Sequence, residues 1–325
     1  MKNAHSFLIA VVAFLAVAQS VIAQQGPINP KQVALLRWYP ANLTTSFAVG
    51  GGWPNELLFD GVNIWVTSNA PGGGVAKLRA SDGTFLGQFS VGGGGQPNGM
   101  AFDGANIWVA EGGDTNFVVK LRASDGATLG TFYVGNDPAG VAFDGVSVWV
   151  ASWGYATVTK LRASDGANLG AFPVGNHPYG VVFDGANIWV ANYADGTVSK
   201  LRASDGTNLG TFPAGSWPWE MAFDGANIWV TNGGYLGRGN TVTELRASDA
   251  FLLGTFPVGN EPTGVAFDGA NIWVANNADS TVSKLRASDG ATLGTFPTGS
   301  NPMGAAFDGA GIWVANNSDA TVSKR

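Results

Sequence analysis

A repeat of 40 to 44 residues runs through most of this chain, and a repeated unit must bury its apolar face against its neighbours. The triplet FDG occurs seven times, with phenylalanine at positions 59, 102, 143, 183, 223, 267 and 307. Each phenylalanine is followed six residues later by a tryptophan. The pentapeptide LRASD occurs six times, beginning at positions 78, 121, 161, 201, 245 and 285. These fixed spacings define seven units.

Each unit reads as four strands joined by three turns. Residues 180–215 are GVVFDGANIWVANYADGTVSKLRASDGTNLGTFPAG, in which Asp-Gly pairs separate apolar runs. Asp-Gly favours tight hairpins because glycine tolerates a positive φ. The first two runs lack polar alternation, so both of their faces must be covered. No helical period supplies that cover, which leaves the neighbouring units. The sequence predicts an all-β, seven-bladed propeller of four-stranded antiparallel blades, with the repeated tryptophan packed between blades.

The two ends of the chain each supply part of one blade. Leu36 and Phe47 are eleven residues apart, the spacing that separates leucine and phenylalanine in all six LRASD units. Residues 303–324 match the inner strands of a blade but lack an outer strand. An open ring would expose an unpaired edge, so we expect the N-terminal strand to close the C-terminal blade. Residues 33–37 and 321–325 match the same third strand; we expect 321–324 to occupy it, with the chain entering near Leu36.

The segment before the repeats has the pattern of a secretory signal. Lys2 and His5 precede an apolar run, and Ala23 ends a VIA tripeptide. We expect a signal peptide over 1–23, a short lead over 24–32 and a single propeller over 33–325. The protein is then secreted or periplasmic after cleavage near Ala23. It has no cysteine, so the core alone must hold the fold. Only 12% of residues are charged and the net charge is −6, which argues against nucleic-acid partners and membrane insertion.

Variation between the repeats falls on one end of the predicted strands. The intervals across the first and third turns never change, whereas the second loop and the connection between blades vary in length and composition. One face of the disc is therefore expected to be uniform and the other variable. Binding usually resides on loops carried by a rigid scaffold. The candidate ligand-binding residues on the variable face are Trp53, Glu111, Trp153, Tyr155, His177, Tyr179, Tyr193, Trp217, Trp219, Glu220, Tyr235 and Glu261. The fifth unit departs most from the others and is the favoured sector.

The chain offers little obvious catalytic chemistry. Its mature part has one histidine, His177, in a loop position where sibling units carry Asp, Glu, Asn, Gln or Trp. The turn aspartates have a structural role. The exceptional acids are Glu56, Glu111, Asp137, Glu220 and Glu261, two of which suit a glycosidase pair or a shared divalent ion. We therefore expect no catalytic residues, no metal ligands and no cofactor. If these acids bind an ion at all, it is magnesium or calcium.

The repeat P-x-G-V-A-F-D-G-A-N-I-W-V-A-N, followed by T-V-S-K-L, resembles bacterial YVTN/NHL-type propeller repeats. It is also similar to the repeats of virginiamycin B lyase-like proteins, over about residues 33–325. The resemblance implies a propeller fold. It also implies functions from extracellular binding and surface-layer roles to a metal-dependent lyase that uses a histidine and acidic ligands near the channel. His177 is the single histidine available for that role, and no matching motif surrounds it.

Three functions remain open at this point. The favoured one is a secreted, non-enzymatic binding or scaffold protein that engages a carbohydrate, a peptide or another protein through aromatic side chains of the variable face. A metal-assisted lyase or hydrolase and a self-assembling structural protein are the alternatives. The variable aromatics also fit simple drift in tolerant loops, where they pack on one another.

Ring closure gives a first prediction. Deleting residues 33–50 removes the outer strand of the composite blade, so we expect an unfolded or aggregating protein. Size-exclusion chromatography and thermal melting measure this. A monomeric deletion variant with unchanged heat stability contradicts the closure.

Overall fold

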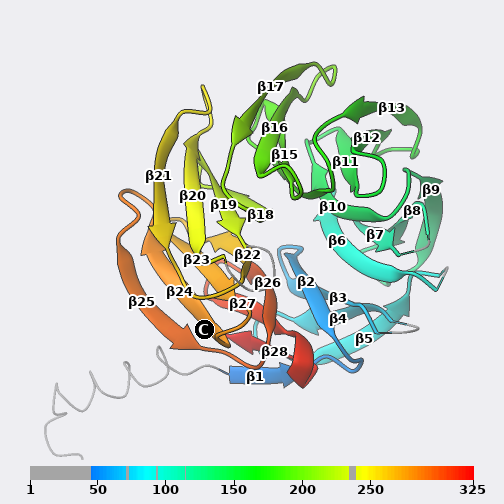
Figure 1. The fold of residues 1–325 in the computed structure, drawn as a ribbon. Helices are drawn as coiled ribbons and strands as arrows, with labels where there is room; N and C mark the ends of the chain where they lie inside the picture. Colours follow the sequence, from blue (N-terminus) through cyan, green and yellow to red (C-terminus); the bar gives the residue numbers. More distant parts are fainter. Residues whose placement is uncertain (1–44, 71–72, 93, 114, 234–238) are drawn as a thin grey trace, which may run out of the picture. The chain divides into compact units, whose positions relative to one another are not determined.

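The computed structural model describes residues 45–325 except 71–72, 93, 114 and 234–238. The expected signal peptide, the short lead, residues 33–44 and the candidate Tyr235 lie outside the described residues. The described part forms seven separate four-stranded antiparallel sheets, arranged as blades around a centre (Figure 1). The predicted seven-bladed β-propeller is confirmed. Among the described residues, no helix is long and apolar enough to span a membrane.

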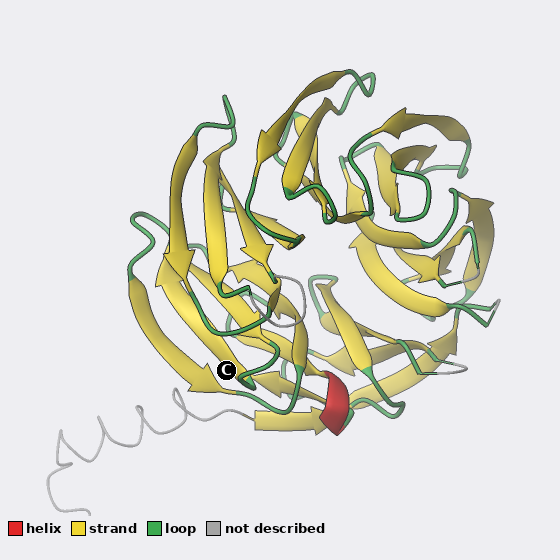
Figure 2. Ribbon diagram, in the orientation of Figure 1, coloured by secondary structure: helices red, strands yellow, loops and turns green. Residues whose placement is uncertain are grey.

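Six blades place their four strands in sequence order from the centre outward, and the last blade has β26, β27 and β28 followed by β1 on the outside. Figure 2 shows the strands of the blades in yellow. The innermost strands are β2 (Pro54–Phe59), β6 (Gln96–Phe102), β10 (Pro138–Phe143), β14 (Pro178–Phe183), β18 (Pro218–Phe223), β22 (Pro262–Phe267) and β26 (Pro302–Phe307). The second strands are β3 (Asn63–Ser68), β7 (Asn106–Gly112), β11 (Ser147–Ser152), β15 (Asn187–Asn192), β19 (Asn227–Asn232), β23 (Asn271–Asn276) and β27 (Ile312–Asn316). We number the blades 1 to 7 from β2 to β26.

The third strands are β4 (Gly74–Arg79), β8 (Phe117–Arg122), β12 (Thr157–Arg162), β16 (Thr197–Arg202), β20 (Thr241–Arg246), β24 (Thr281–Arg286) and β28 (Thr321–Lys324). The outer strands are β5 (Phe85–Ser90), β9 (Thr128–Tyr133), β13 (Asn168–Pro173), β17 (Asn208–Pro213), β21 (Leu252–Pro257), β25 (Thr292–Pro297) and β1 (Thr45–Ala48). A short 3₁₀ turn, η1 (Asn317–Asp319), lies between β27 and β28.

The ring closes as the sequence predicts. Strand β1 pairs antiparallel with β28, with Thr45 opposite Lys324 and Ala48 opposite Thr321. Phe47 lies 5.3 Å from the ring of Trp313, matching the 5.6 Å between Phe89 and Trp65 in blade 1. The third-strand position belongs to residues 321–324, and Arg325 extends it by two backbone hydrogen bonds with Ile312. The innermost strands β2 and β26 are in contact, which joins the first blade to the last.

Each repeated tryptophan fills the space between two blades. Trp65 is fully buried and packs with Val75 of its own blade and with Ile107 and Val109 of the next. Burying so large an apolar ring contributes about 3 kcal/mol or more per site. The inter-blade packing predicted for this residue is confirmed.

The aspartate of FDG does more than shape a turn. In blade 1, Asp60 Oδ1 accepts from the backbone N–H groups of Val62 and Asn63, and Asp60 Oδ2 accepts from Trp65 Nε1 at 2.7 Å. Burial opposes ionisation of Asp60, but the hydrogen bonds from Trp65 and Asn63 outweigh it and lower the pKa. The same indole-to-carboxylate bond occurs in all seven blades. The turn and the buried tryptophan are therefore one structural unit.

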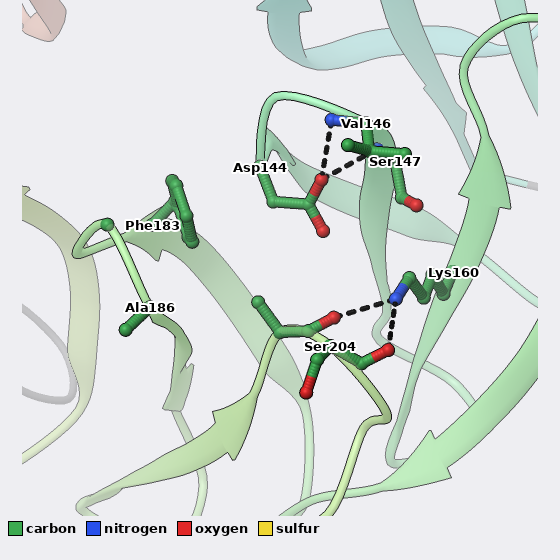
Figure 3. A pocket seen from close by; sticks show the side chains of 9 residues that line it. Asp144, Val146, Ser147, Lys160, Phe183, Ala186 and Ser204 are labelled. Atoms are coloured by element: carbon green, nitrogen blue, oxygen red, sulfur yellow. Dashed lines mark hydrogen bonds between the residues drawn. The ribbon is translucent and has the colours of Figure 1, made fainter.

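In five blades a lysine of the third strand ties this unit to a turn of the next blade. Figure 3 shows Lys160 Nζ donating to the carbonyl oxygens of Ala203 and Ser204, at 2.7 and 3.1 Å. The same ammonium lies 4.9 Å from the ring centroid of Trp149, in cation–π distance. The hollow around it is lined by the turns of blades 3 and 4, including Asp144 and Ala186. Lys77, Lys120, Lys160 and Lys200 are buried, whereas Lys284 and Lys324 are partly buried. All of these lysines belong to the end of the strands that carries the first and third turns.

Blade 5 breaks this pattern with Glu244, where six blades have lysine. Glu244 is 6% exposed and accepts a 2.8 Å hydrogen bond from Asn227 Nδ2. Burial raises its pKa to about 7, with a further contribution from the charge of Asp224. Because the pKa of this carboxyl is raised, its contribution to the free energy of unfolding is fully present below the ordinary pKa of 4.5. That contribution is lost as pH rises through 7.

Replacing Glu244 with lysine is therefore expected to stabilise the protein above pH 7. A buried charge-assisted hydrogen bond and the cation–π contact together suggest about 2 kcal/mol, or a rise of about 5 °C in melting temperature. Thermal melts of Glu244→Lys and wild type at pH 5 and pH 8 measure the gain, which should be larger at pH 8. Lys200→Glu, the reverse change in blade 4, is the matched control and should destabilise. An unchanged or lower melting temperature for Glu244→Lys at pH 8 contradicts the interpretation.

Candidate functional site

The two faces expected from the repeats are present. The second loops pair with the connections between blades, as in the backbone hydrogen bonds from Tyr193 to His177 and from Trp153 to Asp137. The first and third turns pair with each other at the opposite end, as from Ala80 to Val62. We call the end with the second loops and connections the variable face and the other end the uniform face.

A strained backbone position recurs on the variable face. The residue before the conserved proline of each connection has a φ between 51° and 58° in six blades, at Trp53, Asp137, His177, Trp217, Glu261 and Asn301. Non-glycine residues adopt this left-handed conformation infrequently, and it is enriched at functional sites. The scaffold therefore holds the most variable residues of the chain in one fixed orientation.

A pocket of about 310 Å³ opens in the middle of the variable face. All blades except the sixth contribute to its wall, which consists of Asn55, Asn69, Gln96, Asn98, Asp137, Ala139, Trp153, Tyr179, Trp219 and Met303. Its volume is within the range of small-molecule sites. Planar amides, one carboxylate and three aromatic rings thus converge on one hollow.

Six of the predicted residues form one continuous ring cluster beside this pocket. Trp153 stacks on His177 with centroids 4.6 Å apart and planes 6° apart. Tyr193 contacts both Trp153 and Trp217, at 5.1 and 4.6 Å. Tyr179 lies 4.1 Å from Trp219. The structure therefore brings together residues of blades 3, 4 and 5, including the favoured fifth-blade pair Trp217 and Trp219.

The remaining predicted residues lie apart from the ring cluster. Trp53 is 51% exposed, and Tyr155 is 54% exposed and lies near Tyr133 of an outer strand. Glu261 is half-buried in the connection before blade 6 and does not line the pocket. These three side chains are not part of the site that the geometry defines.

Glu111 is buried rather than presented on the variable face. It occupies the position of Asn192, whose amide donates to Thr197 and Ser199. In blade 2 those two partners are replaced by Phe117 and Val119. Both carboxyl oxygens of Glu111 lack a hydrogen-bond partner among the described residues, and burial raises its pKa to about 8. Glu111 is thus neutral below that pH.

The centre of the propeller is lined by a ring of glycines with two exceptions. The second residue after the proline of each innermost strand is Gly99, Gly140, Gly180, Gly264 or Gly304 in five blades, and Glu56 or Glu220 in blades 1 and 5. A Cβ on Gly140 would lie 2.2 Å from the carbonyl oxygen of Tyr179 in the next blade. The inner strands approach too closely there for any side chain.

Each of the two glutamates extends over the glycine of the preceding blade. A Cβ on Gly304 would meet Glu56 Oε1 at 2.9 Å, and one on Gly180 would meet Glu220 Oε2 at 2.9 Å. Glu56 Oε1 also accepts from the backbone N–H of Leu57 at 3.0 Å. Each carboxyl group therefore fits only because the neighbouring blade has a glycine, which has no side chain, at this position.

A threonine accompanies each glutamate. The second strand reads NIWVT in blades 1 and 5, whereas the other five blades have alanine in place of the threonine. The backbone N–H of Glu56 donates to Thr67 Oγ1 at 2.9 Å, and that of Glu220 donates to Thr231 Oγ1 at 3.0 Å. Thr231 in turn donates to the carbonyl oxygen of Thr263 in the next blade, at 2.7 Å. The threonines fix the backbone that carries the two glutamates.

The two glutamates are electrostatically linked to each other and to the pocket. Burial raises the pKa of Glu56 to about 7. Burial also raises the pKa of Glu220 well above its usual range, and the charge of Glu56 raises it further. The pKa of Tyr179 is raised by burial, by Glu220 and by Glu56, and the Asn55 side chain opposes this. Tyr179 and Asn55 line the pocket, so the carboxyl pair lies close to its wall.

Sequence reasoning selected Glu220 but placed Glu56 only among the exceptional acids. A signal for the pair was present, because glutamate replaces glycine in the same two repeats where threonine replaces alanine. Asn55, Asn69, Gln96, Asn98 and Met303 of the pocket wall were also missed as ligand-binding candidates. Polar amides in loops of a repeat carry no distinctive spacing, and their convergence depends on the closed ring.

The fold and this central site define a seven-bladed β-propeller with a ligand-sized hollow at one end of its axis. No family model and no curated protein matches the chain. Among solved structures, the fold is similar to a hydrazine synthase structure from Kuenenia stuttgartiensis, with a TM-score of 0.75, 17% identity, and coverage of 86% of this chain and 96% of that one. It is also similar to a streptogramin B lyase structure, with a TM-score of 0.72, 15% identity, and coverage of 87% and 96%. The expected likeness to virginiamycin B lyase-like propellers holds at the level of fold.

The partly buried carboxyl pair gives a stability prediction. The pKa of Glu56 is about 7 in the folded state, and its ordinary value is 4.5. Above pH 7 the ionised Glu56 therefore lowers the free energy of unfolding. Glu56→Gln should raise the free energy of unfolding at pH 8 by about 2 kcal/mol and change it little at pH 4. Denaturant melts at the two pH values measure this. Gln88→Glu, which adds a carboxyl on the exposed outer strand β5, is the control and should show no such pH dependence. Equal stability of Glu56→Gln and wild type at pH 8 would mean that the carboxyl is not destabilised.

Proposed function

We propose that this propeller is a binding protein that takes a carbohydrate into the pocket at the centre of its variable face. The observation that carries the proposal is the convergence of Trp153, Tyr179 and Trp219 with four amide side chains around about 310 Å³. The apolar faces of sugar rings pack on aromatic rings, and planar amides donate to and accept from hydroxyl groups. A compact hollow of this size suits one or two sugar rings.

The pocket wall is also prepared for hydrogen bonding. The carbonyl oxygen Oδ1 of Asn69 is buried and has no partner among the described residues. Asn55 Nδ2 reaches Asn98 Oδ1 at 3.4 Å, a long and weak contact that leaves the amide able to exchange partners. Unsatisfied polar groups in a wall favour a polar ligand over an apolar one.

Hydrolysis of the bound sugar is the second candidate, because one observation favours it. Glu56 and Glu220 are two carboxyl groups with raised pKa values near the pocket. Glycosidases use such a pair as acid and base or nucleophile. His177, by contrast, is exposed and stacks on Trp153. No group of three or more His, Cys, Asp or Glu side chains suited to a metal is found in the described part of the chain. The N-terminal pattern suggests that either activity is exercised outside the cytoplasm.

Calorimetric titration with a panel of oligosaccharides tests the proposal. We expect binding by at least one member of the panel, weakened at least about tenfold in Trp219→Ala because stacking on the ring is lost. Tyr155→Ala removes an exposed aromatic ring outside the ring cluster and should bind like wild type. Chromatography of the same mixtures detects cleaved products, which Glu220→Gln should abolish if the second candidate holds. Binding that is equally sensitive to Tyr155→Ala and Trp219→Ala contradicts the assigned site.

A further inference from the structure

We propose that the ligand of the central pocket carries a positive charge, and that an amino sugar with a free ammonium group is its chemical class. This inference rests on the proposed carbohydrate-binding function and extends it to the charge of the ligand. Three independent features of the described residues support it.

The first feature is the segregation of charge between the two faces. All described lysines and arginines except Arg325 belong to the KLR segment of the third strands or its equivalent. The lysines reach the turns of the next blade on the uniform face, and the arginines pair with the SDG aspartates there, as Arg79 does with Asp82. Arg325 lies against Phe296. The described part of the variable face therefore has no lysine or arginine.

The same face is rich in acids. Its described connections, second loops and strand ends carry Glu56, Asp137, Asp195, Glu220, Glu261, Asp279 and Asp319. Asp195 and Asp279 are used by the backbone, since they accept from Asn176 and Asn260. Glu56, Asp137 and Glu220 form no ion pair with any described residue. A cleft lined by one sign of charge raises the local concentration of ligands of the opposite sign.

The second feature is that the central carboxyl pair stands at positions where the inner strands leave little room for a side chain. Glu56 and Glu220 replace glycine in a ring where the other five blades tolerate no Cβ. Thr67 and Thr231 secure the two strands that carry them. Neighbouring carboxyl groups oppose each other's ionisation unless a cation is present, and such pairs are typical of functional sites. A bound cation supplies the missing counter-charge.

The third feature is the acceptor geometry of the wall. Asn69 Oδ1 is buried and unpartnered, and only Oδ1 of Asp137 accepts a described hydrogen bond, from the N–H of Gly113. An ammonium group brings three donors and no acceptor, which matches these oxygens. Tyr179 and Trp219, two aromatic residues of the wall, offer cation–π attraction for the same charge. The titratable groups of the wall are Asp137 and Tyr179. Glu56 and Glu220 follow the wall residues Asn55 and Trp219 in the chain, and His177 stacks on Trp153.

The test compares oligomers of equal length that differ in one group. Oligomers of glucosamine, N-acetylglucosamine and glucose are titrated into wild type at pH 6.5 by calorimetry. We expect the glucosamine oligomer to bind at least about tenfold more tightly than its acetylated counterpart, from charge-assisted hydrogen bonds. The double variant Glu56→Gln, Glu220→Gln should lose this preference while keeping its fold. Lys200→Gln, on the uniform face, is the control for the loss of a buried charge and should keep the preference.

The outcomes separate the two proposals. If the neutral oligomers bind as tightly as the amine, and Trp219→Ala weakens them, the binding function holds and the charge inference is wrong. A preference for the amine that survives in the double variant also overturns the inference, since the carboxyl pair is then not its source. If none of the three oligomers binds wild type, both proposals fail.

Discussion

The contact between neighbouring blades is the interaction on which the rest of the structure depends. Its unit is a buried tryptophan whose indole N–H is held by the FDG aspartate, with a lysine above the ring in six blades. The lysine of one blade donates to a carbonyl oxygen in the next, as Lys77 does to Ala123 and Lys324 to Ala80. Because the last blade makes this contact with the first, the contact also closes the ring, and blade 5 lacks it because Glu244 replaces the lysine.

The position of this unit explains why one face is uniform and the other is free to vary. The tryptophan, aspartate and lysine lie toward the first and third turns, so any change there disturbs packing between blades. In the connections one apolar residue, such as Val91 or Val134, is buried in the core between blades, and the other positions there and in the second loops tolerate new side chains. Five glycines around the centre show the second constraint, since the inner strands leave no room for a Cβ. The departures at Glu56 and Glu220 stand out against this rule.

The repeat made the fold predictable to the level of strand order and ring closure. Even the partner of the terminal TVSK strand was correct, since β1 pairs with β28. The fixed spacing was sufficient for this prediction because the same pattern of contacts recurs in all seven units. The site was only partly predictable. Trp153, His177, Tyr179, Tyr193, Trp217 and Trp219 were selected from their variability and form one cluster. Trp53 and Tyr155 share that variability but lie outside the cluster. The sequence places a residue on the variable face but does not say how far it lies from the centre of that face.

Differences among copies of a repeat carry information that the shared pattern does not. Glu244 and Glu220 both occur in blade 5, and both replace a residue that keeps the other blades stable. Glu244 removes a lysine from a structural contact and has no accompanying change in its facing tryptophan, so drift accounts for it. Glu220 is matched by Thr231, and the same pair of changes recurs as Glu56 and Thr67 in blade 1. Two matched departures in separate blades, each next to a residue of the pocket wall, support the proposed binding function over chance.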